Sequence, residues 1–147
     1  MASKILVQGA RPGHGTTTVA VACRLALVGF GPLEVVEVEC DEIRRPRDVL
    51  VVVLRGPDVP GIESAARLPT PDLLVLVAEP GRAVTPDHAA SILQAGALVV
   101  VPIDPEVALA NDSGLFPRRF DELRVFDELR TWLHDWVKFR SLDEAHR

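Results

Sequence analysis

Three short, almost purely Val/Leu runs constrain the fold of this chain more than any other feature of its sequence. They span residues 49–54, 73–78 and 97–101. An uninterrupted apolar run of this length is typical of a strand that is covered on both faces, as in a parallel sheet. Residues 61–68 and 85–95 lie between the runs and indicate crossover helices. The second of these opens with Thr85-Pro86, a cap residue followed by proline at the first helical position.

The N-terminal part of the chain adds two further strands and one helix to this pattern. Residues 4–8 and residues 33–40 are apolar or valine-rich stretches that predict strands. Residues 16–30 are nearly all apolar after three threonines, which predicts a buried helix ending at Gly29 or Gly31. We therefore expect an α/β fold with a doubly wound, mostly parallel sheet of about five strands and helices on both faces. Ligands of such sheets bind at the carboxyl ends of the strands.

The C-terminal segment predicts one amphipathic helix over residues 117–140. Its apolar residues recur at three- and four-residue spacing; they are Leu123, Phe126, Leu129, Trp132, Leu133, Trp136 and Val137. Residues 118–147 carry seven Lys/Arg and seven Asp/Glu, so the helix lacks the cationic polar face of a membrane-surface helix. We expect its apolar face to pack against the sheet or a second subunit, within a single domain spanning residues 1–147.

The overall composition bears on several classes of protein. With 48% hydrophobic residues the chain is too apolar for disorder, yet no apolar run reaches the roughly 18 residues that a membrane helix needs. Its first residues lack the pattern of a signal peptide, so we expect a cytoplasmic protein that does not bind a membrane. A net charge of −5 argues against nucleic acid as a partner. Cys23 and Cys40 lack metal-ligand spacing and are expected to be reduced thiols.

A glycine-rich turn at residues 9–18 is the most specific functional signal in the sequence. It reads GARPGHGTTT and lies between the first expected strand and the first expected helix. A phosphate in such a turn meets backbone N–H groups and the positive end of the helix dipole. Gly13 and Gly15 allow the backbone to approach a ligand, and the Thr17 hydroxyl could ligate magnesium in a turn of the phosphate-loop type. The alternative is a turn whose glycines serve only tight packing.

In this turn the chain resembles the MinD/ParA superfamily of deviant Walker A ATPases, and most closely its CpaE/TadZ-like branch, associated with pilus assembly. That branch often has GAKGGxGTTT-like loops. In the resemblance Arg11 stands at the signature lysine, Pro12 replaces a glycine, and Thr16 replaces the phosphate-loop lysine. Residues 101–114, VPIDPEVALANDSG, are similar to the family's final strand and the turn after it.

The resemblance implies a site for Mg-ATP or Mg-ADP. The nucleotide-binding residues that it implies are Arg11, Gly13, His14, Gly15, Thr16, Thr17 and Thr18. Thr17 would also meet the magnesium ion. Glu39 and Asp41 match the two acidic positions of the family's strand-end D-x-D, which makes Asp41 the catalytic candidate for orienting a water. Alternatives without a functional role stay open. Arg11 could be a solvated surface arginine, and Asp41 could cap a turn or face solvent.

Other polar residues receive no catalytic role from the sequence. The spacing around His14 shows no evident Ser/His/Asp arrangement. We therefore expect a loop histidine without a catalytic role, although it lies in the turn that the resemblance assigns to nucleotide binding. Asp58, Asp104 and Asp112 lie among Pro, Gly and Ser residues, where aspartate favours local hydrogen bonds.

The chain departs from the family at both lysines and at the Walker B strand. That strand ends in aspartate in the family, whereas Leu54 and Arg55 stand there and no carboxylate follows until Asp58. We therefore expect a nucleotide-binding switch or scaffold in intracellular positioning, partition or assembly, with weak or absent hydrolysis and a protein partner or second copy as its target. The alternatives are a scaffold that binds no nucleotide and a genuine slow ATPase. A dinucleotide enzyme would need glycine at Thr18.

Overall fold

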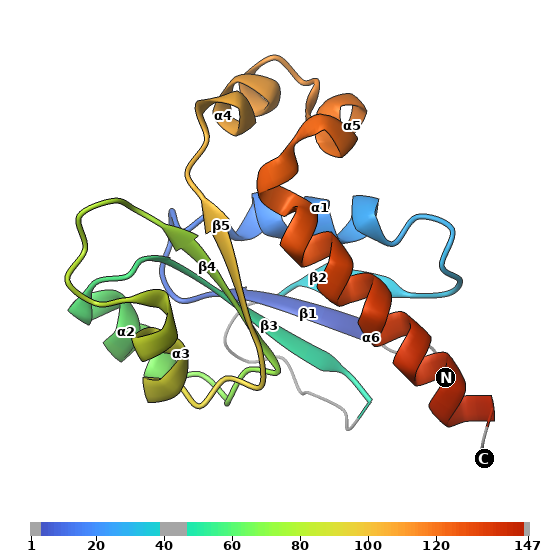
Figure 1. Cartoon of the computed structure of the whole chain (residues 1–147), viewed down its shortest axis with the longest axis horizontal. Helices are drawn as coiled ribbons and strands as arrows, with labels where there is room; N and C mark the ends of the chain where they lie inside the picture. The colour runs from blue at the N-terminus through green and yellow to red at the C-terminus, as the bar shows by residue number, and fades with distance from the viewer. Residues whose placement is uncertain (1–3, 39–46, 146–147) are drawn as a thin grey trace.

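A five-stranded β-sheet lies at the centre of the structure, a computed structural model that describes residues 4–38 and 47–145. The strands are β1 (Lys4–Gly9), β2 (Glu34–Glu37), β3 (Val49–Gly56), β4 (Leu73–Ala78) and β5 (Leu98–Pro102). Every neighbouring pair is parallel, and the order across the sheet is β2-β1-β3-β4-β5 (Figure 1). This confirms the expected doubly wound α/β fold, in the strand order of flavodoxin-like sheets.

The central strands are apolar throughout because both of their faces are covered. In β3, Val51 and Val53 belong to one hydrophobic cluster, whereas Val52 and Leu54 belong to a second cluster on the opposite face. Successive side chains of a strand point to opposite faces. An uninterrupted Val/Leu run is therefore the pattern of a strand that packs against helices on both sides.

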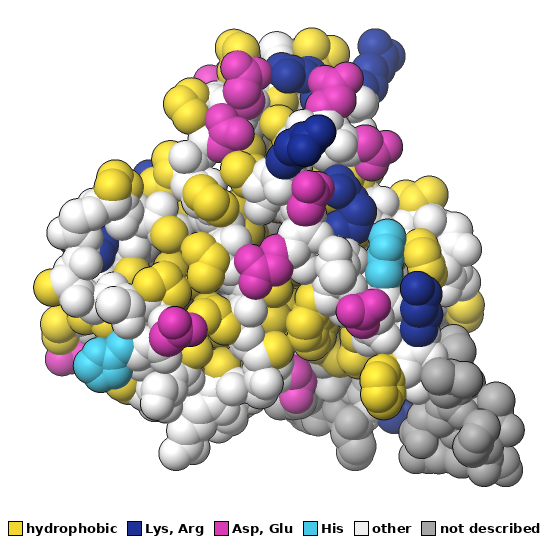
Figure 2. Space-filling view, viewed as in Figure 1, with side chains coloured by type: hydrophobic (Ala, Val, Ile, Leu, Met, Phe, Trp, Pro, Cys, Tyr) yellow, Lys and Arg dark blue, Asp and Glu magenta, His cyan; other side chains and the backbone are white. Residues whose placement is uncertain are grey.

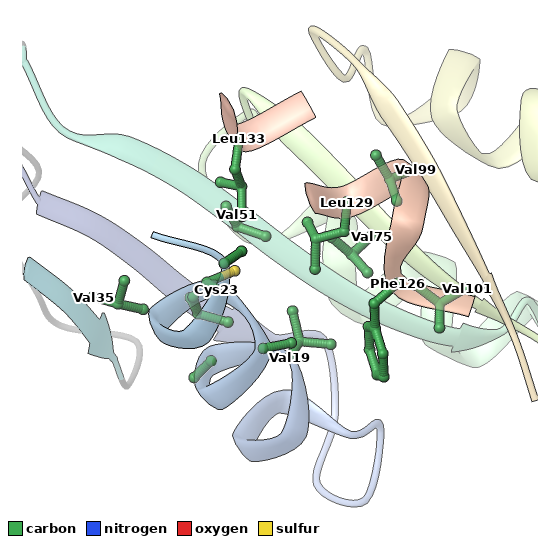
Figure 3. Close-up of a cluster of buried hydrophobic side chains, with 14 of the residues drawn as sticks. Val19, Cys23, Val35, Val51, Val75, Val99, Val101, Phe126, Leu129 and Leu133 are labelled. Carbon is green, nitrogen blue, oxygen red and sulfur yellow. The ribbon is translucent and has the colours of Figure 1, made fainter. Parts of the chain in front are cut away.

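Helices cover both faces of this sheet. They are α1 (Thr16–Ala26), α2 (Val59–Ala66), α3 (Pro86–Ile92), α4 (Pro105–Asp112), α5 (Phe116–Arg119) and α6 (Asp127–Ala145). On one face α1 and α6 pack on the strands through Val19, Leu129 and Leu133 (Figure 1, Figure 3). On the other face α2 and α3 pack through Ile62 and Ala89. The chain thus forms a helix–sheet–helix sandwich of three layers.

The C-terminal segment differs from the single helix expected over residues 117–140. Two 3-10 turns, Phe120–Glu122 and Arg124–Phe126, separate α5 from α6. The break comes at Leu123, whose φ of −85° and ψ of 89° are not helical. It brings together the rings of Phe116, Phe120 and Phe126, whose centroids lie 5.6 to 6.0 Å apart. Packing of these rings in the hydrophobic core outweighs the helical periodicity of the segment.

The apolar stripe of α6 packs on the sheet, which was one of the two expected partners for it. Leu129 and Leu133 are fully buried, and Trp132 and Trp136 are partly buried against the same cluster. The ring Nε2 of His134 lies 2.7 Å from a carbonyl oxygen near the end of α1. Helix α6 therefore covers β3, β4 and β5 on one face of the sheet and packs beside α1.

Several boundaries also differ from the sequence expectations. The helix expected to reach Gly29 or Gly31 stops at Ala26, because Leu27 already leaves helical geometry with φ of −104° and ψ of 9°. Gly29 and Gly31 then adopt positive φ in the turn that follows. The second strand ends at Glu37 rather than at residue 40, and residues 39–46 lie outside the described part of the chain. Helix α4 was not expected.

The surface over α4 and α5 carries charges of both signs. Arg119 lies 3.2 Å from a carboxylate oxygen of Glu106 and 3.4 Å from one of Glu122. Figure 2 shows basic and acidic side chains interspersed in this region. None of the helices in residues 4–38 and 47–145 has the length and apolar character to cross a membrane.

Cys23 is buried in α1 as a free thiol. Burial raises its pKa to about 12, so the thiol stays protonated and unreactive. This agrees with the expected reduced state, while Cys40 lies outside the described residues.

Candidate ligand site at the carboxyl ends of the strands

The carboxyl ends of all five strands lie along one edge of the sheet, because every pair is parallel. The glycine turn follows β1, and the turn after β3 lies beside it because β1 and β3 are neighbours. Helices α1 and α2 leave these two strands toward opposite faces. The crevice between β1 and β3 is therefore the topological switch point, where ligands of doubly wound sheets bind.

Two glycines shape the turn through their backbone conformation. Gly13 and Gly15 have φ of 83° and 87°, in the left-handed region that other residues rarely adopt. A Cβ added at either position would meet nothing within 4 Å. Tight packing therefore does not explain these glycines, whereas the backbone path into α1 does.

Gly9 has a different role. A Cβ added there would overlap the side-chain oxygen of Thr16, which lies over the glycine. Glycine at the end of β1 thus permits close packing between the strand end and the first residue of α1. Of the three turn glycines Gly9, Gly13 and Gly15, only Gly9 fits the packing alternative.

The first turn of α1 presents its backbone N–H groups without a side-chain cap. Gly15 is the N-cap residue, and no side-chain cap hydrogen bond forms there. The first N–H groups of any helix lack partners within the helix. The amides of Thr16, Thr17 and Thr18 therefore lie at the positive end of the helix dipole without acceptors inside the helix, which is the arrangement that an anion would need.

The three threonine hydroxyls are directed to different partners. That of Thr16 packs over Gly9. Thr17 Oγ1 donates a 2.8 Å hydrogen bond to Oε1 of Glu37, at the end of β2. Thr18 Oγ1 accepts one of 3.3 Å from Nδ2 of Asn111 in α4. Within residues 4–38 and 47–145, Thr17 is the one of these three threonines whose hydroxyl bonds to a carboxylate, and oxygen ligands of this kind suit magnesium.

Glu37 is a site residue that sequence reasoning missed. The resemblance directed attention to Glu39 and to the catalytic candidate Asp41, which both lie outside the described residues. Glu37 precedes them on the same expected strand, and its alternation with Glu39 was the available signal. Within residues 4–38 and 47–145, no group of three or more His, Cys, Asp or Glu side chains is arranged to hold a metal ion.

His14 joins the glycine turn to β3. Its Nδ1 accepts a 3.2 Å hydrogen bond from the backbone N–H of Arg55, so this nitrogen carries no proton. Burial lowers the pKa of His14 below 6.5, with Arg11 and Arg55 acting in the same direction and Asp58 and Glu79 in the opposite one. The imidazole is therefore held neutral at pH 7 and bridges the switch point.

The expected arginine of the turn and an unexpected one both lie near enough to His14 to lower its pKa. Arg11 is exposed, where a guanidinium can reach an anion in solution. Arg55 is the last residue but one of β3, and its Nε lies 3.9 Å from a Glu79 carboxylate oxygen that Arg82 approaches more closely, at 3.2 Å. Arg55 therefore keeps donors for a further anionic group.

The expected local roles of two aspartates are confirmed. Asp58 Oδ1 accepts a 2.7 Å hydrogen bond from the N–H of Gly61 and caps α2. Asp104 Oδ1 accepts one of 2.9 Å from the N–H of Glu106 and caps α4. The first carboxylate after β3 is thus engaged in capping a helix, and Asp112 is the last residue of α4.

Comparison of the chain with protein-family models, with curated proteins and with solved structures found no match in any of the three. The all-parallel, five-stranded α/β sheet is the part of the expected likeness that the structure bears out. The finer likeness to MinD/ParA proteins rests on the residues of the glycine turn and on the segments quoted with it.

Proposed function

We propose that the chain binds the phosphates of a nucleotide at residues 9–18 and acts as a MinD/ParA-like switch or scaffold with weak or absent hydrolysis. The observation that carries this proposal is the left-handed pair Gly13 and Gly15 leading into the uncapped first turn of α1 at the switch point. Glycines whose Cβ positions are open to space, in front of free helix amides, are the features that phosphate binding needs.

The roles of the surrounding residues follow from their positions. The amides of Thr16 to Thr18 would hold the phosphates, and Arg11 would neutralise part of their charge. Magnesium, as Mg-ATP or Mg-ADP, would shield phosphate charge, and the Thr17 hydroxyl with the nearby Glu37 carboxylate offers it oxygen ligands. Weak hydrolysis is favoured because β3 ends in Arg55 and Gly56 without a carboxylate and because Asp58 caps α2.

A scaffold that binds no nucleotide is the second candidate. It is favoured by the hydrogen bond between His14 and Arg55, which fastens the glycine turn to β3 without any ligand. In that case the turn would serve the fold alone, and the chain would act through contacts with a protein partner or a second copy of itself.

Calorimetric titration with Mg-ATP, Mg-ADP and the GTP equivalents separates these candidates. We expect saturable binding that the double variant Arg11→Ala, Thr17→Ala loses. The matched control is Arg118→Ala, Thr131→Ala, which removes an exposed arginine and an exposed threonine from the tail. Absence of binding at millimolar nucleotide overturns the switch and favours the scaffold. Turnover that disappears in Asp41→Ala would instead identify a slow ATPase.

A further inference from the structure

A cavity of about 230 Å³ opens beside the first turn of α1, and it extends from the glycine turn to apolar walls that phosphate binding does not require. Its walls come from the ends of β3, β4 and β5, from α1 and α4, and from the segment before α6. Val19, Val101 and Phe126 belong to its lining and are almost completely buried. Figure 3 shows these three side chains, from three different elements, on the α1 and α6 face of the sheet.

The size and lining of the cavity suit a ring. An apolar cavity of about 150 Å³ is large enough for benzene, so this one has room for a group of one or two rings. Val77 and Val107 add further apolar surface to the walls. An aromatic or aliphatic ring placed here would leave water for a surface that is mostly hydrocarbon.

Polar groups are placed at one side of the same cavity. Arg55 lines it, and its side chain is 44% exposed with its closest carboxylate partner at 3.9 Å. Asp104 also lines it, but its charge faces the N-terminus of α4, which it caps. The guanidinium of Arg55 is therefore the charge best placed to pair with a ligand, and it selects an anion.

We propose that this cavity binds the ring of a small anionic ligand, with Arg55 pairing with its carboxylate or phosphate. His14, Gly15 and Thr18 of the glycine turn also line the cavity. If the ligand is the nucleotide of the proposed function, the cavity holds its base and the inference rests on that function; if it is an aromatic carboxylate, the inference stands without it. An aromatic carboxylate and a nucleotide both have this chemistry, and the experiment distinguishes them.

The binding test is a ¹³C-methyl NMR titration of the full chain with phenylacetate, indole-3-acetate, adenosine monophosphate and pyrophosphate. We expect the ring-bearing anions to shift the methyl signals of Val19, Val77, Val101 and Val107 saturably. Val52, buried on the opposite face of the sheet, is the internal control. Equal shifts at Val52, or no saturable shift with any ring-bearing anion up to millimolar concentration, overturn the proposal.

Paired variants test the geometry. Ala108→Phe fills the cavity from an exposed position of α4 and should weaken ring binding at least about tenfold. Leu109→Phe, at the next position and 57% exposed, should leave binding unchanged. Arg55→Gln should weaken binding about threefold, as expected for a partly exposed ion pair. Arg82→Gln, which removes the other arginine beside Glu79, should not. Equal effects of the two α4 variants, or of the two arginine variants, contradict the placement of the ligand in this cavity beside Arg55.

The four ligands also separate this proposal from nucleotide binding at the turn. Pyrophosphate binding without binding of any ring-bearing anion supports the phosphate site and overturns the ring site. Binding of the aromatic carboxylates without binding of pyrophosphate or adenosine monophosphate supports the ring site and overturns the phosphate site. If adenosine monophosphate binds, and Ala108→Phe weakens its binding without weakening the binding of pyrophosphate, the ring in the cavity is that of the nucleotide.

Discussion

The backbone N–H of Arg55 donates a 3.2 Å hydrogen bond to Nδ1 of His14, and this bond ties the glycine turn to the end of β3. The bond spans the crevice between β1 and β3, from which α1 and α2 leave toward opposite faces of the sheet. A side chain from the turn thus occupies a crevice that doubly wound sheets commonly use for ligands. The protonation state of one imidazole is therefore coupled to the position of the turn.

Mild acid should weaken the fold through His14. Burial lowers its pKa below the ordinary 6.5, so between these two values the unfolded chain binds more protons than the folded chain. The contribution of the neutral imidazole to the free energy of unfolding is complete above about pH 6.5 and declines as the pH falls through this window. Urea denaturation at about pH 7.5 and about pH 5.5 measures the decline. His14→Gln should show a smaller decline, and an equal one would assign it to other groups.

Neutralising Asp58 should lower the pKa of His14 further. The carboxylate opposes the effect of burial on this imidazole, and Asp58→Asn removes its charge while keeping an oxygen that can cap α2. An NMR titration of the His14 ring signals follows the shift. Asp87→Asn, in the first turn of α3, removes a carboxylate that is not among the charges acting on His14 and should have no effect. A His14 pKa that stays the same in Asp58→Asn would contradict the coupling.

Gly9→Ala should destabilise the fold by about 1–3 kcal/mol, because the new methyl group would overlap the Thr16 hydroxyl. Adding Thr16→Ala should restore most of the loss, since it removes the oxygen. Adding Thr16→Ser should not, since it keeps that oxygen. Denaturant unfolding of the single and double variants gives the coupling free energy, and equal behaviour of the two double variants would exclude the hydroxyl as the cause.

Thr17→Val should weaken binding of magnesium nucleotide more than binding of nucleotide in the presence of a chelator. It removes the hydroxyl that lies 2.8 Å from Glu37, and with it the expected magnesium ligand. The backbone amides that would hold phosphate remain. Thr18→Val is the matched control, because its hydroxyl accepts from Asn111 instead. Equal losses with and without magnesium would show that Thr17 does not meet the metal.

Phe126→Ala should cost about 3–5 kcal/mol of stability, the range for a large aromatic side chain removed from a core. Phe126 is 2% exposed and packs against Phe116 and Phe120. Phe139→Ala, at a position 78% exposed, should change stability by less than about 0.5 kcal/mol. Thermal or urea denaturation compares the two. Similar costs would mean that the core does not depend on the Phe126 ring.

The elements that could be predicted from sequence are those whose pattern is local. The strand expected at residues 73–78 is observed at those bounds as β4, and Thr85 caps α3 through a hydrogen bond to the N–H of His88. The break at Leu123 could not be predicted in this way, because the three phenylalanine rings that accompany it meet only in the folded molecule.

In the candidate site, too, the local features could be predicted from the sequence and the long-range contacts could not. Residues 9–18 could be located because glycine and threonine report on backbone conformation over a few residues. Arg55, Glu37 and Asn111 could not, because each meets the turn from a different strand or helix. The roles of the turn residues toward a nucleotide remain predictions.

The all-parallel sheet also has a consequence for how the chain reaches its native state. None of the neighbouring strand pairs in the described sheet is a hairpin, and Ile5 must find Val49 before β1 and β3 can pair. Such distant pairings slow folding. The face of β3 and β4 that holds Val51 and Val75 is covered by α6, which a ribosome synthesises after all five strands. A nascent chain exposes that apolar face until α6 emerges, and is most open to aggregation or chaperone capture during that interval.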